Sequence, residues 1–361
     1  MSKTAYLVIS DLHFSDKQNN NRYNYNKEIL DAVNKLINII TKYRRDNYNV
    51  KLLYLGDLID RSYKDVFKAI WVNNLFIHLN KYVQGSYVTL GNHEFSFYTN
   101  NPFWTLVRNV ESERVKSCLS KSWAPQGLFD VVHIVDTLQD GNVVFHFNHH
   151  PTPVSKPLAQ KTNIGLFHKD YAPKGVIAES EQQYKLDIWS EPIELIDNTS
   201  ILDGYHYAFF GHNHKLYGTW YYTSDKSGWS TWLYHLASLG RPNHTEVNNN
   251  FLERNIPAVI VEDGEFIKVE DNKFDLLARD ICVNEEVVEK RKEVYEATKE
   301  AKHYKEETLG SIGVSDNPIE NIKGFLAQSP TLLNTFEEYL KVDKTNQEHI
   351  LEDRMEALKW I

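Results

Sequence analysis

The amino-acid sequence predicts an α/β protein: a layered α/β/β/α sandwich of two mixed sheets flanked by helices, with a helical appendage at the C-terminus. Three observations lead to this fold class. Short apolar stretches alternate with amphipathic helical patterns over the first hundred residues, a period-two pattern with hairpin signals follows, and charged helical sequence fills the end of the chain. The 361 residues, 42% of them hydrophobic, are enough to bury a sizeable core.

The first part of the sandwich is predicted from βαβ units. Apolar strands are expected at residues 5–10, 51–55 and 86–90, with amphipathic helices at 27–43 and 66–82 between them. Each of these strands runs directly into polar residues. Because ligands of open α/β sheets bind at the carboxyl ends of the strands, the polar residues are expected to converge.

From residue 131 the pattern has the period of a half-buried strand. Residues 131–138 and 142–150 flank Asp140-Gly141, a dipeptide typical of a tight hairpin turn. Two further apolar strands, at 163–168 and 207–214, each end in histidine. Four later stretches indicate antiparallel pairs: 219–224 with 229–238, and 257–263 with 265–271.

The chain is expected to divide into two domains, residues 1–273 and residues 274–361. Beyond residue 273 the sequence becomes charged helix, with helix boundaries indicated at Asn317-Pro318 and Ser329-Pro330. Of the net charge of −9, residues 274–361 carry −7 and residues 1–273 carry −2. An acidic segment is unsuited to wrapping a polyanion, so we expect it to bind a protein partner or to pack as a solvated appendage.

Composition also bears on location. The two cysteines, Cys118 and Cys282, are too few for a disulfide framework, which favours a reducing compartment. No apolar run reaches the length of a membrane span, and the N-terminal apolar stretch is interrupted early by Asp11 and His13. We therefore expect a cytoplasmic protein with no membrane partner and no signal peptide.

Four groups of polar residues follow apolar strands and carry the chemistry. Asp11 and His13 follow the first strand, and Asp57 follows the second. The other two groups are Gly91-Asn92-His93-Glu94 and Gly211-His212-Asn213-His214. Oxygen and nitrogen ligands without a thiolate suit borderline divalent ions; we favour manganese, with iron or zinc as alternatives. A carboxylate able to bridge, Asp57, indicates two ions rather than one.

In their order and strand context these groups resemble the motifs of the calcineurin-like metallophosphoesterases, which read D-x-H, G-D-x-x-D, G-N-H-[DE], H and G-H-x-H. The resemblance covers residues 5 to about 240 and excludes the helical appendage. It implies a two-metal centre whose ligands come from these strand ends: Asp11, His13 and His214 for one ion, Asn92 and His212 for the other, and Asp57 as the bridge.

The resemblance further implies two catalytic residues beside the metals, His93 and Asp60, and Arg61 next to them is a third candidate. His93 protonates the leaving oxygen, and Asp60 orients His93. Arg61, adjacent to Asp60, either makes a bidentate contact with phosphate or forms a surface salt bridge. Histidine suits the first role because its proton is exchangeable near neutral pH.

The isolated histidine motif, which supplies the last metal ligand, has two candidates. His168 ends the apolar strand 163–168, whereas His149 lies in a His-x-Pro sequence that resembles some phosphodiesterase members of the family. The hairpin at Asp140-Gly141 makes the stretch with His149 the returning arm that precedes the motif strand. We therefore predict His168 as the ligand and keep His149 as the alternative. Residues 169–206 either cover the site or form a surface excursion.

The predicted activity is hydrolysis of phosphodiester bonds in nucleic acid or a nucleotide, by a hydroxide shared between two metal ions. Leu90 stands where the protein phosphatases of the superfamily carry arginine, and the helical C-terminal extension more closely resembles SbcD-type DNA-repair exonucleases. The alternatives are a phosphomonoesterase for a small metabolite or phosphoprotein, and a non-catalytic interaction protein whose metals only stabilise the fold. His93 and Asp60, which a structural metal site does not need, argue against the last.

Overall fold

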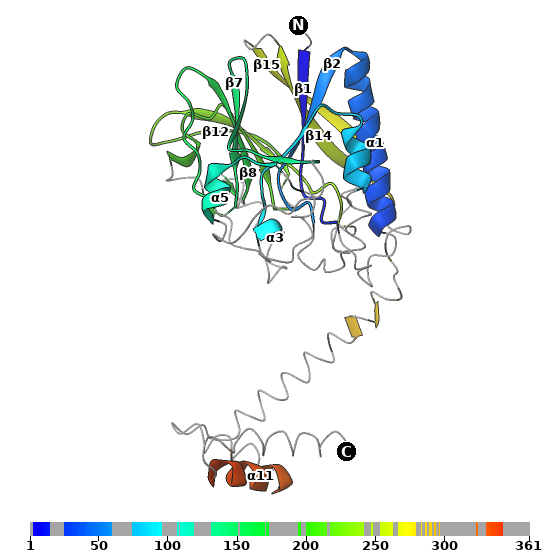
Figure 1. Ribbon diagram of the computed structural model, residues 1–361, viewed down its shortest axis with the longest axis vertical. Coiled ribbons are helices and arrows are strands. Elements are labelled where there is room, and N and C mark those ends of the chain that lie inside the picture. Colours follow the sequence, from blue (N-terminus) through cyan, green and yellow to red (C-terminus); the bar gives the residue numbers. More distant parts are fainter. Residues whose placement is uncertain are drawn as a thin grey trace. The chain divides into compact units, whose positions relative to one another are not determined.

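The structure is a computed structural model with two compact units, Met1–Glu285 and Glu286–Ile361 (Figure 1). It describes residues 3–14, 25–59, 74–95, 107, 109–118, 131–150, 152–169, 171–172, 194–195, 200–214, 217–241, 247, 253–262, 266–278, 283, 286, 289–290, 292–293, 296, 323 and 330–341.

One sheet of the first unit has seven strands: β1 (Lys3–Ile9), β2 (Tyr48–Tyr54), β3 (Ser86–Val88), β4 (Asn109–Val110), β5 (His133–Ile134), β14 (Glu253–Glu262) and β15 (Phe266–Asp275). Their order is β15-β14-β1-β2-β3-β5-β4. β1, β2 and β3 run parallel, while β14 pairs antiparallel with both β1 and β15. The sheet is therefore mixed, with its parallel centre made by the predicted βαβ strands.

The other sheet has six strands: β6 (Thr137–Asp140), β7 (Val143–Asn148), β8 (Thr162–His168), β11 (Tyr207–Gly211), β12 (Gly218–Thr223) and β13 (Ser230–His235). Their order is β12-β13-β11-β8-β7-β6, with antiparallel pairs at the two edges and parallel pairs between. The predicted hairpin is confirmed: Asp140 pairs with Val143, and Gly141 takes a φ of 57°, which suits a glycine in a tight turn.

The stretch 131–138 does not form one hairpin arm as predicted. Its first part, β5, pairs with β3 and β4, whereas β6 pairs with β7 in the other sheet. At the crossing, the Asp136 carboxylate accepts hydrogen bonds from Ser112 Oγ (2.6 Å) and Arg114 Nε (2.8 Å). These bonds hold the chain where it passes between the sheets, a long-range effect that strand periodicity does not reveal.

Helices and small elements complete the fold: α1 (Tyr25–Arg45), α3 (Asn92–Phe95), α5 (Glu113–Cys118), α11 (Pro330–Lys341), the 3₁₀ turn η2 (Ser200–Leu202), β9 (Tyr171–Ala172) and β10 (Glu194–Leu195). The predicted helix at 27–43 is confirmed as α1. Residues 74–80 are helical, and the earlier part of the helix predicted at 66–82 lies outside the described residues.

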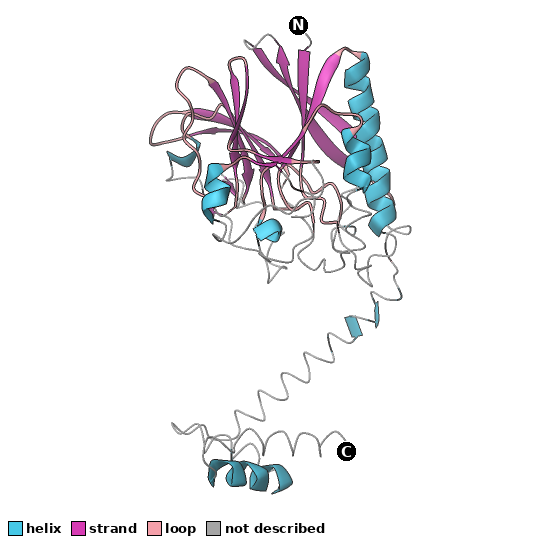
Figure 2. Ribbon diagram, viewed as in Figure 1, coloured by secondary structure: helices cyan, strands magenta, loops and turns pink. Residues whose placement is uncertain are grey.

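Figure 2 shows the two sheets facing each other. Side chains from both sheets, such as Val8, Phe145 and Phe209, form a shared apolar core. A second core lies on the outer face of the seven-stranded sheet, where α1 packs through its apolar stripe, Ile29 and Val33 among it. The outer face of the six-stranded sheet has a core of its own, to which η2 contributes Leu202. The structure thus shows the predicted layered α/β sandwich of two mixed sheets.

A buried ion pair joins α1 to the segment after β13. Glu28 accepts hydrogen bonds from Arg241 Nε (3.0 Å), Arg241 Nη2 (3.0 Å) and the Arg241 backbone N–H (3.1 Å), and both side chains are fully buried. Two residues earlier, the Leu239 N–H donates to the carbonyls of Ser10 and Asp11. The pair therefore anchors a segment that supports the end of β1.

The C-terminal unit is described over α11 and a few separate residues. We predicted the domain division after residue 273; β15 continues to Asp275, and the first compact unit extends to Glu285. Most of the helical sequence predicted between residues 274 and 361 lies outside the described residues. Within the part of the chain that the structure describes, no helix is both long and apolar enough to span a bilayer.

Candidate metal centre

The carboxyl ends of the strands bring the predicted ligands together. Asp11 and His13 follow β1, and Asp57 follows β2, whose pairing with β1 is parallel over its whole length. His168 ends β8, and His212 follows the neighbouring parallel strand β11. Because both sets of parallel strands end at the same side of the sandwich, residues more than two hundred positions apart meet there (Figure 1).

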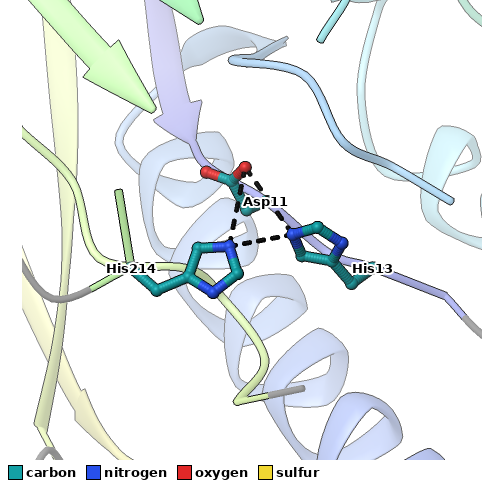
Figure 3. A group of neighbouring side chains, drawn as sticks. All are labelled: Asp11, His13 and His214. Atoms are coloured by element: carbon teal, nitrogen blue, oxygen red, sulfur yellow. Dashed lines mark hydrogen bonds and ion pairs between the residues drawn. The ribbon is translucent and has the colours of Figure 1, made fainter. Parts of the chain in front are cut away.

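One group of potential ligands consists of Asp11, His13 and His214. Figure 3 shows the two imidazole rings facing each other, with the carboxylate of Asp11 above them. The Nε2 atoms of His13 and His214 are 2.8 Å apart, and Asp11 Oδ1 lies 3.9 Å and 4.0 Å from them. Three potential donor atoms therefore surround one point, which is the arrangement a bound cation requires.

Two more groups share Asp57. One combines Asp57 with His13 and His93, and the other combines it with His168 and His212. Asp57 Oδ2 lies 3.2 Å from His168 Nε2, 3.7 Å from His13 Nε2 and 3.8 Å from His93 Nε2. The predicted bridging carboxylate thus stands between two overlapping sets of nitrogen donors.

His168 Nε2 is the meeting point of the second set. It lies 3.2 Å from Asn92 Oδ1 and 3.1 Å from His212 Nδ1, so the amide predicted as a ligand faces the same spot as the two imidazoles. The predicted catalytic residue His93 reaches the cluster from α3, and its ring packs edge-on against His13 at 4.7 Å. Asp60 and Arg61, the other two predicted catalytic residues, lie outside the described residues.

The backbone around the site is unusual. Asp11, His13, Asp57 and His212 all have positive φ angles, of 28°, 43°, 47° and 85°. Non-glycine residues rarely adopt this region, and strain of this kind collects at functional sites. Gly56, with a φ of 95°, has no such cost, and a Cβ there would lie 2.5 Å from His168 Nδ1. The glycine before Asp57 therefore lets the imidazole approach the turn.

The donor set fits divalent cations. Asp11 Oδ1 is buried and accepts no hydrogen bond from any residue that the structure describes, although Ser10 Oγ and the His212 N–H both donate to Oδ2. Burial lowers the pKa of His13 well below its usual value, and burial together with His168 lowers the pKa of His212 to about 3. Neutral imidazoles and a carboxylate oxygen that accepts no hydrogen bond are ligands that manganese, iron or zinc accept.

The family follows from a comparison with known protein families: residues 5–216 match the model of the calcineurin-like phosphoesterases. The chain belongs to this family. No protein with a curated description matches the chain. The matched range contains the whole set of strand-end ligands from Asp11 to His214.

Solved structures similar to this chain include the NAD nucleotidase NadN of Haemophilus influenzae, at 13% identity and a TM-score of 0.41 over 76% of this chain and 50% of that one. A 5′-nucleotidase precursor from Thermus thermophilus has 11% identity and a TM-score of 0.38, over 83% and 59%. A dimetal phosphatase from Danio rerio has 13% identity and a TM-score of 0.39, over 77% and 100%. The chain thus spans 50% and 59% of the length of the two nucleotidases.

Glu94 is a residue of this phosphoesterase site to which sequence reasoning assigned no role. Its side chain is fully buried and accepts three backbone hydrogen bonds: from Asp57 N–H (3.0 Å), Leu58 N–H (2.8 Å) and Gly91 N–H (2.8 Å). Burial and then the Asp57 carboxylate raise the pKa of Glu94 to about 7, although these donors act against the rise. A carboxylate directly after Asn92-His93 was the available signal, but two of its three partners, Asp57 and Leu58, follow a different strand.

His149, the alternative ligand, has both ring nitrogens engaged elsewhere. Its Nδ1 accepts the Leu90 N–H at 3.1 Å, and its Nε2 donates to the Val135 carbonyl at 2.9 Å. Burial lowers the pKa of His149 to about 4, so the ring is neutral at physiological pH. Asp57 and Asp11 outweigh the effect of burial and raise the pKa of His168 to about 10 when no metal is bound, so a cation that binds there must displace a proton. The preference for His168 as ligand stays a prediction with this geometry in its favour.

Replacing each histidine with alanine should separate these two roles. We expect His168→Ala to lose at least one bound metal ion per chain, measured by mass spectrometry of the purified protein, because it removes a nitrogen from the Asp57 group. His149→Ala should keep its metal and lose about 2–3 kcal/mol of unfolding free energy, since two buried backbone groups lose their partner. Metal loss from His149→Ala alone would reverse the assignment.

Proposed function

We propose that the chain is a dinuclear-metal phosphodiesterase that acts on nucleic acid or a nucleotide. The observation that carries this proposal is the pair of candidate ligand groups that share Asp57, one with His13 and His93 and the other with His168 and His212; His13 also belongs to the group with Asp11 and His214. A single structural metal has no need of a shared carboxylate. Two divalent cations, when bound, supply activation of a water for attack on phosphorus and neutralise charge on the phosphoryl oxygens.

The residues of the chain would divide the work as follows. Asp11, His13 and His214 hold one cation, and His212, His168 and Asn92 hold the other, with Asp57 between them. Glu94 fixes the turn that carries Asp57 by accepting its N–H. His93 is the proposed proton donor to the leaving oxygen. The side chain of His93 is 15% exposed, whereas that of Asp57 is 2% exposed. His93 therefore lies at the rim of the cluster, where its ring can contact both the cluster and a bound substrate.

The choice of a diester rests on charge. Among the described residues, the ion pairs of Asp11 and Asp57 are all with histidine, and none is with lysine or arginine. A phosphomonoester carries up to two negative charges near neutral pH and a diester carries one, so beyond the two cations no lysine or arginine paired with these carboxylates is at hand for the second charge. Leu90, where arginine would stand in a protein phosphatase, is fully buried and lies in the core. Both features support a diester substrate.

The substrate class can be tested with four compounds assayed in the presence of manganese. We expect cleavage of bis-p-nitrophenyl phosphate and of short single- or double-stranded DNA at rates above that of p-nitrophenyl phosphate. Dependence of the rate on DNA length would identify a nuclease, and its absence a nucleotide phosphodiesterase. Cleavage of the monoester alone would overturn the diester proposal and establish the phosphomonoesterase alternative.

A further inference from the structure

A hollow of about 680 Å³ lies at the other end of the seven-stranded sheet from the metal centre. Its walls are the end of α1 with the start of β2 (Arg44 and residues 46–50), the turn before β3 (residues 81–84) and Lys3 at the start of β1. The predicted metal ligands follow the carboxyl ends of β1 and β2, which lie at the opposite end of the sheet from the amino ends of these strands (Figure 1). The hollow is lined by residues at the amino ends. Strands of seven residues therefore separate the two sites by about 20 Å.

Hydrogen bonds fix the walls of this hollow. The Asn47 N–H donates to the Arg44 carbonyl (3.1 Å), which closes the turn between α1 and β2. Gln84 ties the opposite wall to β2: its N–H donates to the Val50 carbonyl (2.8 Å), and its side-chain amide donates to Asn49 Oδ1 (2.6 Å). The hollow is thus formed by the fold itself, as small-ligand sites usually are, and its volume is typical of them, at about 300–1,000 Å³.

The side chains that line the hollow carry a net positive charge. Three cations line the hollow, Lys3, Arg44 and Lys81, against one carboxylate, Asp46. Lys3 pairs with Glu262 at 3.2 Å, but within the described part of the chain the side chains of Arg44 and Lys81 have no hydrogen-bond or ion-pair partner. The helix dipole accounts for a cation at the end of α1, and so for Arg44, but not for Lys81 on a separate turn.

We propose that this hollow binds a phosphate-bearing small molecule, with Arg44 and Lys81 as the partners of the phosphate. A guanidinium offers phosphate two parallel N–H donors, and an ammonium adds a compact positive charge. The two side chains together therefore suit a ligand with a phosphate group better than a ligand with a single carboxylate. Amide side chains on both walls, Asn47 and Gln84, supply neutral donors for the rest of the ligand. None of the metal-ligand groups found among the described residues lies in the hollow, so binding there is independent of the metals and of the proposed function.

Calorimetric titration of the full-length protein with inorganic pyrophosphate tests this proposal. EDTA in the buffer prevents metal-dependent binding at the other site. We expect wild type to bind with a Kd of about 1 mM or tighter, and Arg44→Gln/Lys81→Gln to bind at least about tenfold more weakly. The matched control, Lys27→Gln/Arg45→Gln, removes the same charge from exposed positions outside the hollow and should bind within about twofold of wild type.

Three results would overturn the proposal: no binding by wild type, equal binding by Arg44→Gln/Lys81→Gln, or an equal loss in the control pair. The last would mean that net charge rather than the hollow attracts the anion. Thermal unfolding of each variant identifies misfolded protein, and both removed side chains are exposed, so the unfolding midpoint should not change. Hydrolysis with manganese should also be unchanged, which separates failure here from failure of the proposed function.

Discussion

Replacing Asp57 with asparagine is expected to reduce kcat/KM for any phosphoester substrate by about 10³-fold or more, which corresponds to about 4 kcal/mol of transition-state stabilisation. Among the described residues, Asp57 is the one carboxylate that lies within 4 Å of all three of His13, His93 and His168. The surrounding histidines, His168 first, outweigh burial and hold the pKa of Asp57 well below its usual range. The side chain is therefore anionic, and asparagine removes that charge with little change of shape.

The same substitution should lower the metal content by at least one ion per chain, measured by mass spectrometry of the purified protein. Asparagine also tolerates the positive φ of this position, so the turn itself should survive. Asp225→Asn, in the exposed turn between β12 and β13, makes the same chemical change away from the site and should retain full activity. Full activity and full metal content in Asp57→Asn would contradict the two-metal arrangement.

The strands and the residues at their ends could be predicted from the sequence because both signals are local. Asp11 and Asp57 each follow an apolar run directly, and parallel strands bring their carboxyl ends together without any further information. The hairpin at Asp140-Gly141 likewise needs only the turn dipeptide and the two flanking patterns. The side chains predicted as metal ligands are therefore close in space because the strand order places them so.

Other features depend on contacts between distant positions, which periodicity does not encode. The crossing between sheets after β5 depends on Asp136 and its bonds to Ser112 and Arg114, and nothing in the strand pattern marks it. The Glu28–Arg241 pair joins residues 213 positions apart. His149 and His168 have similar surroundings in sequence, and only the partners of their ring nitrogens in the fold distinguish them.

Glu94 is the most consequential of these long-range contacts, and Glu94→Gln should show it. Glutamine keeps one acceptor oxygen and replaces the other with an NH₂ group, which would face backbone N–H groups of Asp57, Leu58 or Gly91. We expect the free energy of unfolding to fall by about 2–3 kcal/mol, since a buried donor loses its acceptor and two donors are brought together. Thermal and urea unfolding measure this loss.

The same variant should bind manganese and hydrolyse substrate about 10- to 100-fold less well, because Glu94 fixes the turn that presents Asp57 and, through Asp57 Oδ1, the N–H of His93. Glu94→Asp keeps both oxygens on a shorter side chain, so its metal affinity and activity should lie between those of wild type and those of Glu94→Gln. Glu113→Gln, at an exposed carboxylate on α5, is the matched control and should change neither property. A Glu94→Gln protein that is less stable but binds metal as tightly as wild type would show that Glu94 contributes only to folding. If this buried carboxylate positions Asp57 in the metal centre, stability and metal affinity should both fall in Glu94→Gln and partly recover in Glu94→Asp.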